Sequence, residues 1–190
     1  MYKQEQGNYE EAISNATTAL HILEELHRLK NPRMLTDTFV ARNLASAYNT
    51  LSNIHSDFGN HQEGLGFALK SLALQQFIGI PANIHAAYFT LANRYFSKYQ
   101  DSRARNDADS SALFYQRFLQ FAENNPETTE PLDLAHTQHN LASLAISRQD
   151  FEAAKRSIAQ AEALYEAEQD PAGIIDVEIL KANVFIGQEQ

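Results

Sequence analysis

The sequence predicts an all-α fold built from antiparallel helix pairs. Ala and Leu supply 47 of the 190 residues, whereas Val and Thr supply only 12, so strong helix formers far outnumber β-branched residues. The prolines interrupt the chain about every 40 to 50 residues, and each interval has room for two helices and a turn. Between them, apolar residues recur three and four positions apart, which is the spacing of one helix face.

Eight helices follow from this spacing. The turns inside helix pairs are expected at Gly59-Asn60 and Gln149-Asp150, and the breaks between pairs carry proline. The expected helices cover residues 9–30, 36–58, 61–78, 82–99, 107–124, 131–147, 150–168 and 172–186.

The composition excludes several classes of protein. The chain has no Cys, which rules out disulfide scaffolds, thiolate zinc sites and cysteine nucleophiles. A net charge of −9 argues against a nucleic-acid partner, because phosphate binding needs a basic surface. No apolar run approaches the roughly 20 residues that span a bilayer, and residues 1–7 lack the apolar core of a signal peptide. We therefore expect a cytoplasmic chain, although a longer parent protein could lie elsewhere.

A short pattern recurs along the chain. Its second-helix part reads Gly7, Asn8 and Tyr9, then Gly59, Asn60 and His61, then Gln149, Asp150 and Phe151. Its first-helix part reads Tyr48, Leu51 and Ser52, then Tyr88, Leu91 and Ala92, then Gln138, Leu141 and Ala142. This pattern resembles the tetratricopeptide repeat (TPR). The longer spacing resembles the repeats of kinesin light chains and of bacterial signalling regulators.

The resemblance implies an α-solenoid, in which the helix pairs stack along a right-handed superhelix. Small residues at Ser52, Gly64, Ala92, Ala142 and Ala154 would let paired helices approach closely. We expect one array over 1–190, with units at about 1–32, 36–80, 82–125 and 131–170 and a partial unit at 171–190.

The array departs from the repeat at three places. An insertion of about seven residues is expected around 101–107, the first unit lacks most of its first helix, and the last stops at Gly187. The segment 172–186 is apolar on too many sides for a solvent-facing end. We expect either a piece of a longer array or self-association through this helix.

No catalytic motif is present, so we expect no enzyme and no cofactor. The best metal candidate is Asp133, His136 and His139, spaced to share one helix face, but such groups are common by chance and we expect no metal site. Of the other histidines, His55 and His61 are expected to pack in the interior, and His21, His27 and His85 to lie on the surface. Residues 150–190 hold nine acidic and three basic residues, which we interpret as a solvated face.

The resemblance places a binding surface on the concave face, which the first helix of each pair would line. Asparagine amides could pair with an extended peptide backbone, and phenylalanine could contact an apolar side chain. The expected binding residues are Ser46, Asn49, Asn53, Phe89, Asn93, Phe96, His136, His139 and Ser143.

Three functions remain open at this point. The leading one is a module that binds a protein or peptide, as the sensory or scaffold part of a bacterial signalling or transcription-regulatory protein. The alternative is a receptor for a short signalling peptide held in the groove. The third is a metal-dependent enzyme that uses His136 and His139.

Overall fold

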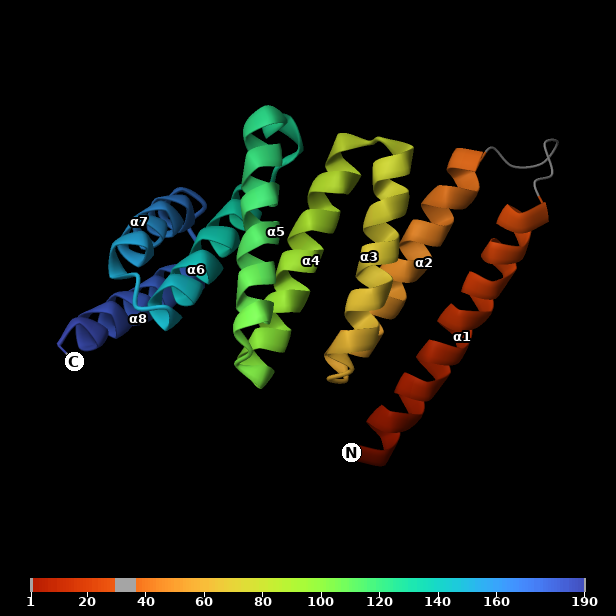
Figure 1. The fold of residues 1–190 in the computed structure, drawn as a ribbon, viewed down its shortest axis with the longest axis horizontal. Helices are drawn as coiled ribbons and strands as arrows, with labels where there is room; N and C mark the ends of the chain where they lie inside the picture. The colour runs from red at the N-terminus through yellow and green to blue at the C-terminus, as the bar shows by residue number, and fades with distance from the viewer. Residues whose placement is uncertain (1, 30–36, 190) are drawn as a thin grey trace. The chain divides into compact units, whose positions relative to one another are not determined.

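The computed structural model describes residues 2–29 and 37–189, and these residues form eight α-helices, one short 3-10 helix and no strand (Figure 1). The expected all-α fold of neighbouring helix pairs is confirmed. The helices are α1 (Tyr2–Leu29), α2 (Asp37–Asp57), α3 (His61–Ile78), α4 (Pro81–Ser102), α5 (Arg105–Asn124), α6 (Pro131–Ser147), α7 (Phe151–Ala167) and α8 (Pro171–Gln188), with the 3-10 helix η1 at Pro126–Thr128. Among the described residues, no helix is both long and apolar enough to cross a membrane.

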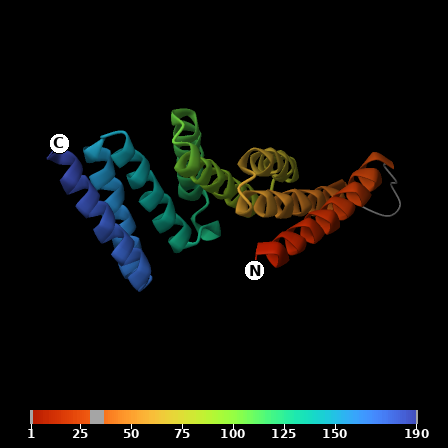
Figure 2. The same ribbon diagram turned by 90° about the horizontal axis from the view of Figure 1, so that it is seen from below.

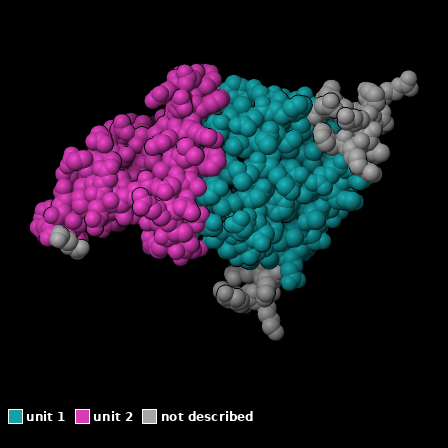
Figure 3. Space-filling model, in the orientation of Figure 1, with its two compact units in different colours: residues 1–98 teal, residues 99–190 magenta. Residues whose placement is uncertain are grey.

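The chain forms two compact units, residues 1–98 and 99–190 (Figure 3). In unit 1, α2 packs against α1 and α3. In unit 2, α6 contacts α5, α7 and α8, and α7 contacts α8, so that α6, α7 and α8 lie side by side (Figure 2). The division into repeat units stays a prediction.

The core of unit 1 joins α1 to α2 and α2 to α3. Its buried cluster is Leu20, Val40, Leu44, Tyr48 and Leu51. The Tyr48 hydroxyl donates to Glu24 Oε1 on α1 at 2.8 Å, and burial together with this carboxylate raises the pKa of Tyr48 to about 12.

The contact between α2 and α3 is close because small residues meet there. A Cβ placed on Gly64 would lie 3.0 Å from the carbonyl oxygen of Ser52, a residue that is itself fully buried. The buried Ser71 hydroxyl on α3 donates to the carbonyl oxygen of Ala45 on α2 at 2.9 Å. The expected role of Ser52 and Gly64 in close helix packing is confirmed.

The core of unit 2 uses alanines in the same way. Ala142 on α6 and Ala154 on α7 are fully buried, which agrees with their expected place between paired helices. Asn140 Nδ2 on α6 donates to the hydroxyl of the fully buried Tyr115 on α5 at 2.6 Å. The buried cluster around α6, α7 and α8 is Ala135, Ala142, Ala154, Ile158, Ala161, Tyr165, Val177, Leu180 and Val184.

Three tight turns have one geometry. Gly59, Gln149 and Gln169 have positive φ angles of 78°, 60° and 56°. In each turn the next residue donates its backbone N–H to the carbonyl five positions earlier, at 2.8, 3.0 and 2.9 Å, which closes the preceding helix. The carboxylates of Asp150 and Asp170 then cap the following helices. The turns expected at Gly59-Asn60 and Gln149-Asp150 are confirmed.

Proline stands at the first residue of three helices, α4, α6 and α8. This position suits proline because the first backbone N–H of a helix has no intrahelical partner and the ring already holds the helical φ angle. The breaks expected at Pro81, Pro131 and Pro171 are confirmed. Pro32 lies outside the described residues.

Three expectations were wrong. The first helix does not begin at residue 9, since α1 runs without interruption from Tyr2 to Leu29. The gap expected between helices 82–99 and 107–124 is shorter, because α4 continues to Ser102 and α5 begins at Arg105. His85 is buried rather than on the surface, with 3% of its area exposed. His21 is exposed as expected, and His27 falls outside the described side chains.

Candidate functional site

Ser46, Asn49 and Asn53 form an exposed polar stripe along α2. They are spaced by three and four residues, so they share one side of the helix. The buried residues Leu44, Tyr48 and Leu51 interleave with them on the side that faces the core. The three expected residues on α2 are therefore accessible together.

Arg94 on α4 reaches this stripe at Asn53. Its Nη2 donates to Asn53 Oδ1 at 2.6 Å, and its Nη1 lies 3.8 Å from Asp57 Oδ1. Burial lowers the pKa of Arg94 and the neighbouring Asp57 opposes that shift; the guanidinium remains charged at neutral pH. The structure thus adds to the expected residues a cation that orients the Asn53 amide.

Arg94 was not among the binding residues predicted from the sequence. Its partners Asn53 and Asp57 lie on a different helix, α2, and Asn53 is 41 residues away in the sequence. Helical periodicity therefore gives no indication of the pairing.

The three expected residues on α4 differ in exposure. Phe89 and Asn93 are half-buried, whereas Phe96 is buried, with 9% of its area exposed. A ligand on this surface would contact Phe89 and Asn93 but little of the Phe96 side chain.

In unit 2 the expected residues His136, His139 and Ser143 lie along one side of α6. His136 is exposed, and its ring centroid lies 5.7 Å from that of Tyr165 on α7. His139 is half-buried. Burial lowers the pKa of His139, Asp176 on α8 opposes this shift, and His136 adds to it. At neutral pH the His139 ring is therefore neutral and can both donate and accept a hydrogen bond.

The metal hypothesis finds no geometry to support it. Within residues 2–29 and 37–189, no group of three His, Asp or Glu side chains lies close enough together to hold a metal ion. His55 is half-buried and its ring lies 5.4 Å from that of Phe67, and His61 is half-buried as well. These two histidines pack against the interior, as expected.

The outer side of α8 is apolar. Ile175, Ile179 and Ile186 share one side of the helix and are each more than half exposed, and Phe185 is 64% exposed. The opposite side carries the buried Val177, Leu180 and Val184. A helix that is apolar on both sides is generally covered on both.

Comparisons with known proteins give one family and one fold. Residues 44–76, which span most of α2 and α3, match the tetratricopeptide repeat family. The crystal structure of BtubC (BKLC) from P. vanneervenii has a similar fold, with a TM-score of 0.69 at 18% sequence identity over 95% of this chain. The match covers 66% of BtubC, so this chain spans just under two thirds of the length of that protein. No curated protein matches the sequence.

Proposed function

We propose, from the match of residues 44–76 to the tetratricopeptide repeat family, that the chain is a non-catalytic module that binds a protein or peptide partner. Stacked helix pairs recognise partners over an extended surface and need no reactive group for it. By resemblance, the parent protein is a bacterial signalling or transcription-regulatory protein, the chain is its sensory or scaffold part, and it acts in the cytoplasm.

The observation that carries this proposal is the stripe Ser46, Asn49 and Asn53, with Arg94 fixed at its end. A primary amide offers a donor and an acceptor, which matches the peptide bonds of an extended ligand whatever its side chains. Because Arg94 occupies Asn53 Oδ1, the Asn53 amide is held in one orientation, with its NH2 group as the donor. We include Asn93 and Phe89 of α4 in this surface, and His136, His139 and Ser143 of α6 as the corresponding surface of unit 2.

The test uses peptides selected against the chain from a random display library, with affinity measured by calorimetry. The double variant Asn53→Ala with Asn93→Ala should weaken binding roughly 30-fold if each amide makes one hydrogen bond of about 1 kcal/mol. Asn15→Ala, at an exposed position on α1, is the matched control. Affinity that is unchanged in the double variant, or lost equally in the control, would refute this surface.

The same experiment separates a scaffold from a receptor. A ligand that binds only the folded protein raises its melting temperature. Stabilisation by short library peptides would favour a peptide receptor, whereas peptides that bind only when displayed on a folded carrier would favour a scaffold.

We also propose that the chain self-associates through α8. The outer residues Ile175, Ile179, Ala182 and Ile186 have a spacing that is symmetric about the middle of the helix. In an antiparallel pair of α8 helices, Ile175 faces Ile186 of the second copy and Ile179 faces Ala182. Such a two-fold contact is self-complementary, and it sets Glu178 against Asn183 rather than against another acid.

Light scattering tests this contact over a range of concentrations. The chain should form dimers, and Ile179→Glu should be monomeric because a buried carboxylate without a partner is costly. Phe77→Glu, at a 69% exposed position on α3, should leave the dimer intact. A parent chain that is monomeric at the highest concentration would contradict the proposal.

A further inference from the structure

Three arginines line a small pocket in unit 2, where the turn between α4 and α5 meets the end of α6. The pocket has a volume of about 300 Å³ and is lined by Tyr99, Arg103, Arg105, Ala108, Ser147 and Arg148. The whole chain carries a net charge of −9, yet this lining holds three guanidinium groups and no carboxylate. A local reversal of charge of this kind indicates an anionic ligand.

Arg103 is held at the pocket by its backbone and by Tyr99. Its φ angle is 54°, and its backbone N–H donates to the carbonyl oxygen of Tyr99 at 2.8 Å, which ends α4. This turn brings the guanidinium over the Tyr99 ring, 5.6 Å from its centroid. Stacking on the ring restricts the side chain and leaves its N–H groups available at the edge.

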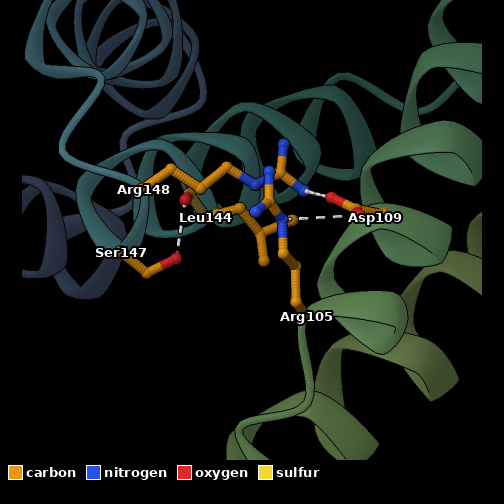
Figure 4. A network of polar contacts seen from close by, with 5 residues as sticks. All are labelled: Arg105, Asp109, Leu144, Ser147 and Arg148. Atoms are coloured by element: carbon orange, nitrogen blue, oxygen red, sulfur yellow. Dashed lines mark hydrogen bonds and ion pairs between the residues drawn. The ribbon is translucent and has the colours of Figure 1, made fainter.

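Arg105 and Arg148 meet at one carboxylate, that of Asp109 on α5 (Figure 4). Arg148 Nη2 donates to Asp109 Oδ1 at 2.7 Å, and Arg105 Nε lies 4.0 Å from Asp109 Oδ2. The Arg105 side chain is 90% exposed and that of Arg148 is 39% exposed. A single carboxylate therefore holds two guanidinium groups, one from α5 and one from the end of α6. With Arg103 included, the three arginines and Asp109 have a formal excess of two positive charges.

Two other acids near these residues accept hydrogen bonds elsewhere. Asp107 is buried and accepts a hydrogen bond from Ser102 Oγ at 3.1 Å. Asp150 accepts from the backbone N–H of Ala153 at 3.0 Å as the cap of α7. The start of α5 at Arg105 adds the positive end of a helix dipole on the same side.

The charge and the size of the pocket select the ligand. A carboxylate would offer Arg105 and Arg148 no more than Asp109 already does, whereas a phosphate monoester carries nearly two charges and three acceptor oxygens. The pocket is larger than a single phosphate group needs, so the ligand brings an organic part with it. Nucleic acid and anionic membranes would present many charges to a chain of net charge −9, and repulsion elsewhere would disfavour both.

We propose that this pocket binds a phosphate monoester, presented as phosphoserine or phosphothreonine on a protein partner. Arg103, Arg105 and Arg148 hold the phosphate oxygens, and Tyr99 positions Arg103. The peptide source of the phosphate rests on the proposed function, but the site is separate from the stripe on α2. A variant that loses binding at one surface can therefore still be tested for binding at the other.

The experiment uses the full chain labelled with 15N and three probes: the peptide Ala-Ala-phosphoserine-Ala-Ala, its unphosphorylated twin, and inorganic phosphate. The readout is the arginine Nε–H resonances, which also report weak binding. The phosphopeptide should shift the resonances of Arg103, Arg105 and Arg148 and bind at least about tenfold more tightly than its twin. Equal affinity for both peptides would overturn the site, and equal affinity for inorganic phosphate would overturn its assignment to a protein partner.

Variants separate the site from general charge. Arg105→Ala with Arg148→Ala should weaken phosphopeptide binding by about tenfold or more. Because Arg148 also links α6 to α5 through Asp109, Arg103→Ala serves as a second variant with no part in that link, and it should weaken binding as well. Arg156→Ala, exposed on α7, is the control. Retained binding in both arginine variants, or equal loss in the control, would refute the proposal, and Asn53→Ala should leave phosphopeptide binding unchanged.

Discussion

Arg94 on α4 donates a hydrogen bond to Asn53 on α2, with 2.6 Å between Nη2 and Oδ1. The side chain of Arg94 is only 20% exposed, so its donors depend on protein acceptors more than on water. The bond links an exposed residue of the candidate binding surface to the packing of two helices. Asn53 therefore belongs both to the proposed binding surface and to a contact between α2 and α4.

Asn53→Ala should lower the free energy of unfolding by about 1 kcal/mol, because the half-buried guanidinium loses an acceptor. Asn49→Ala, at an exposed position on the same stripe, should change it by no more than about 0.5 kcal/mol. Urea unfolding followed by circular dichroism measures both. Equal effects of the two substitutions would show that the Arg94 contact contributes nothing.

Two neighbouring glycines of α3 should respond in opposite ways to alanine. A Cβ on Gly64 would meet Ser56 Oγ and the backbone oxygen of Ser52, so Gly64→Ala should destabilise the chain by about 1–3 kcal/mol. A Cβ on Gly66 has no atom within 4 Å, so Gly66→Ala should stabilise it by roughly 0.5–1 kcal/mol. Thermal unfolding measures the melting temperature of both variants. Changes of the same sign in the two variants would contradict the close contact of α2 and α3.

Glycine should be better than glutamine at two of the tight turns. Gln149 and Gln169 hold φ angles of 60° and 56°, which cost a residue with a Cβ about 1–2 kcal/mol. A substitution to glycine removes this strain, but the greater freedom of glycine in the unfolded chain offsets part of the stabilisation. Gln149→Gly and Gln169→Gly should each stabilise the chain by roughly 0.5–1 kcal/mol. Gln160→Gly, in the middle of α7, should instead destabilise it by about 1 kcal/mol, and denaturant midpoints decide the outcome.

Stability should fall as the pH drops below about 6.5, the ordinary pKa of histidine. Burial lowers the pKa of His139 in the folded chain, against the attraction of Asp176. Below pH 6.5 the unfolded chain therefore binds more protons than the folded chain, and stability is lost down to the folded pKa. His139→Gln should flatten this part of the profile of unfolding free energy against pH. A profile unchanged by His139→Gln would contradict the assignment.

Most of the helical architecture could be predicted from local signals. The ranges 61–78 and 131–147 were predicted to the residue. Pro131 cannot lie inside a helix, and Gly59 and Gly79 readily adopt the positive φ angle at which a helix ends. The helix start expected at residue 9, directly after Gly7 and Asn8, was wrong. Glycine costs a helix only about 1 kcal/mol, so it permits a turn without requiring one, and α1 continues through it.

The candidate surface was only partly predictable. Periodicity placed Ser46, Asn49 and Asn53 on one exposed side of α2, since that depends on one helix alone. The burial of Phe96 and His85 and the pairing of Arg94 with Asn53 depend on how helices pack against one another. The arginine pocket was missed because its side chains come from two turns that lie more than 40 residues apart in sequence.

The order of the cores along the chain bears on synthesis. The buried cluster of unit 1, with the side chains packed on it, lies entirely before residue 75. The buried cluster around α6, α7 and α8 begins at Ala135 and ends at Val184. A ribosome adds about 5–20 residues per second. The cluster of unit 1 can therefore form roughly 5 to 20 seconds before the last residue of the second cluster, Val184, is synthesised. Contacts between neighbouring helices form within about milliseconds. We therefore expect the N-terminal unit to fold on the nascent chain, ahead of the arginine pocket and of α8.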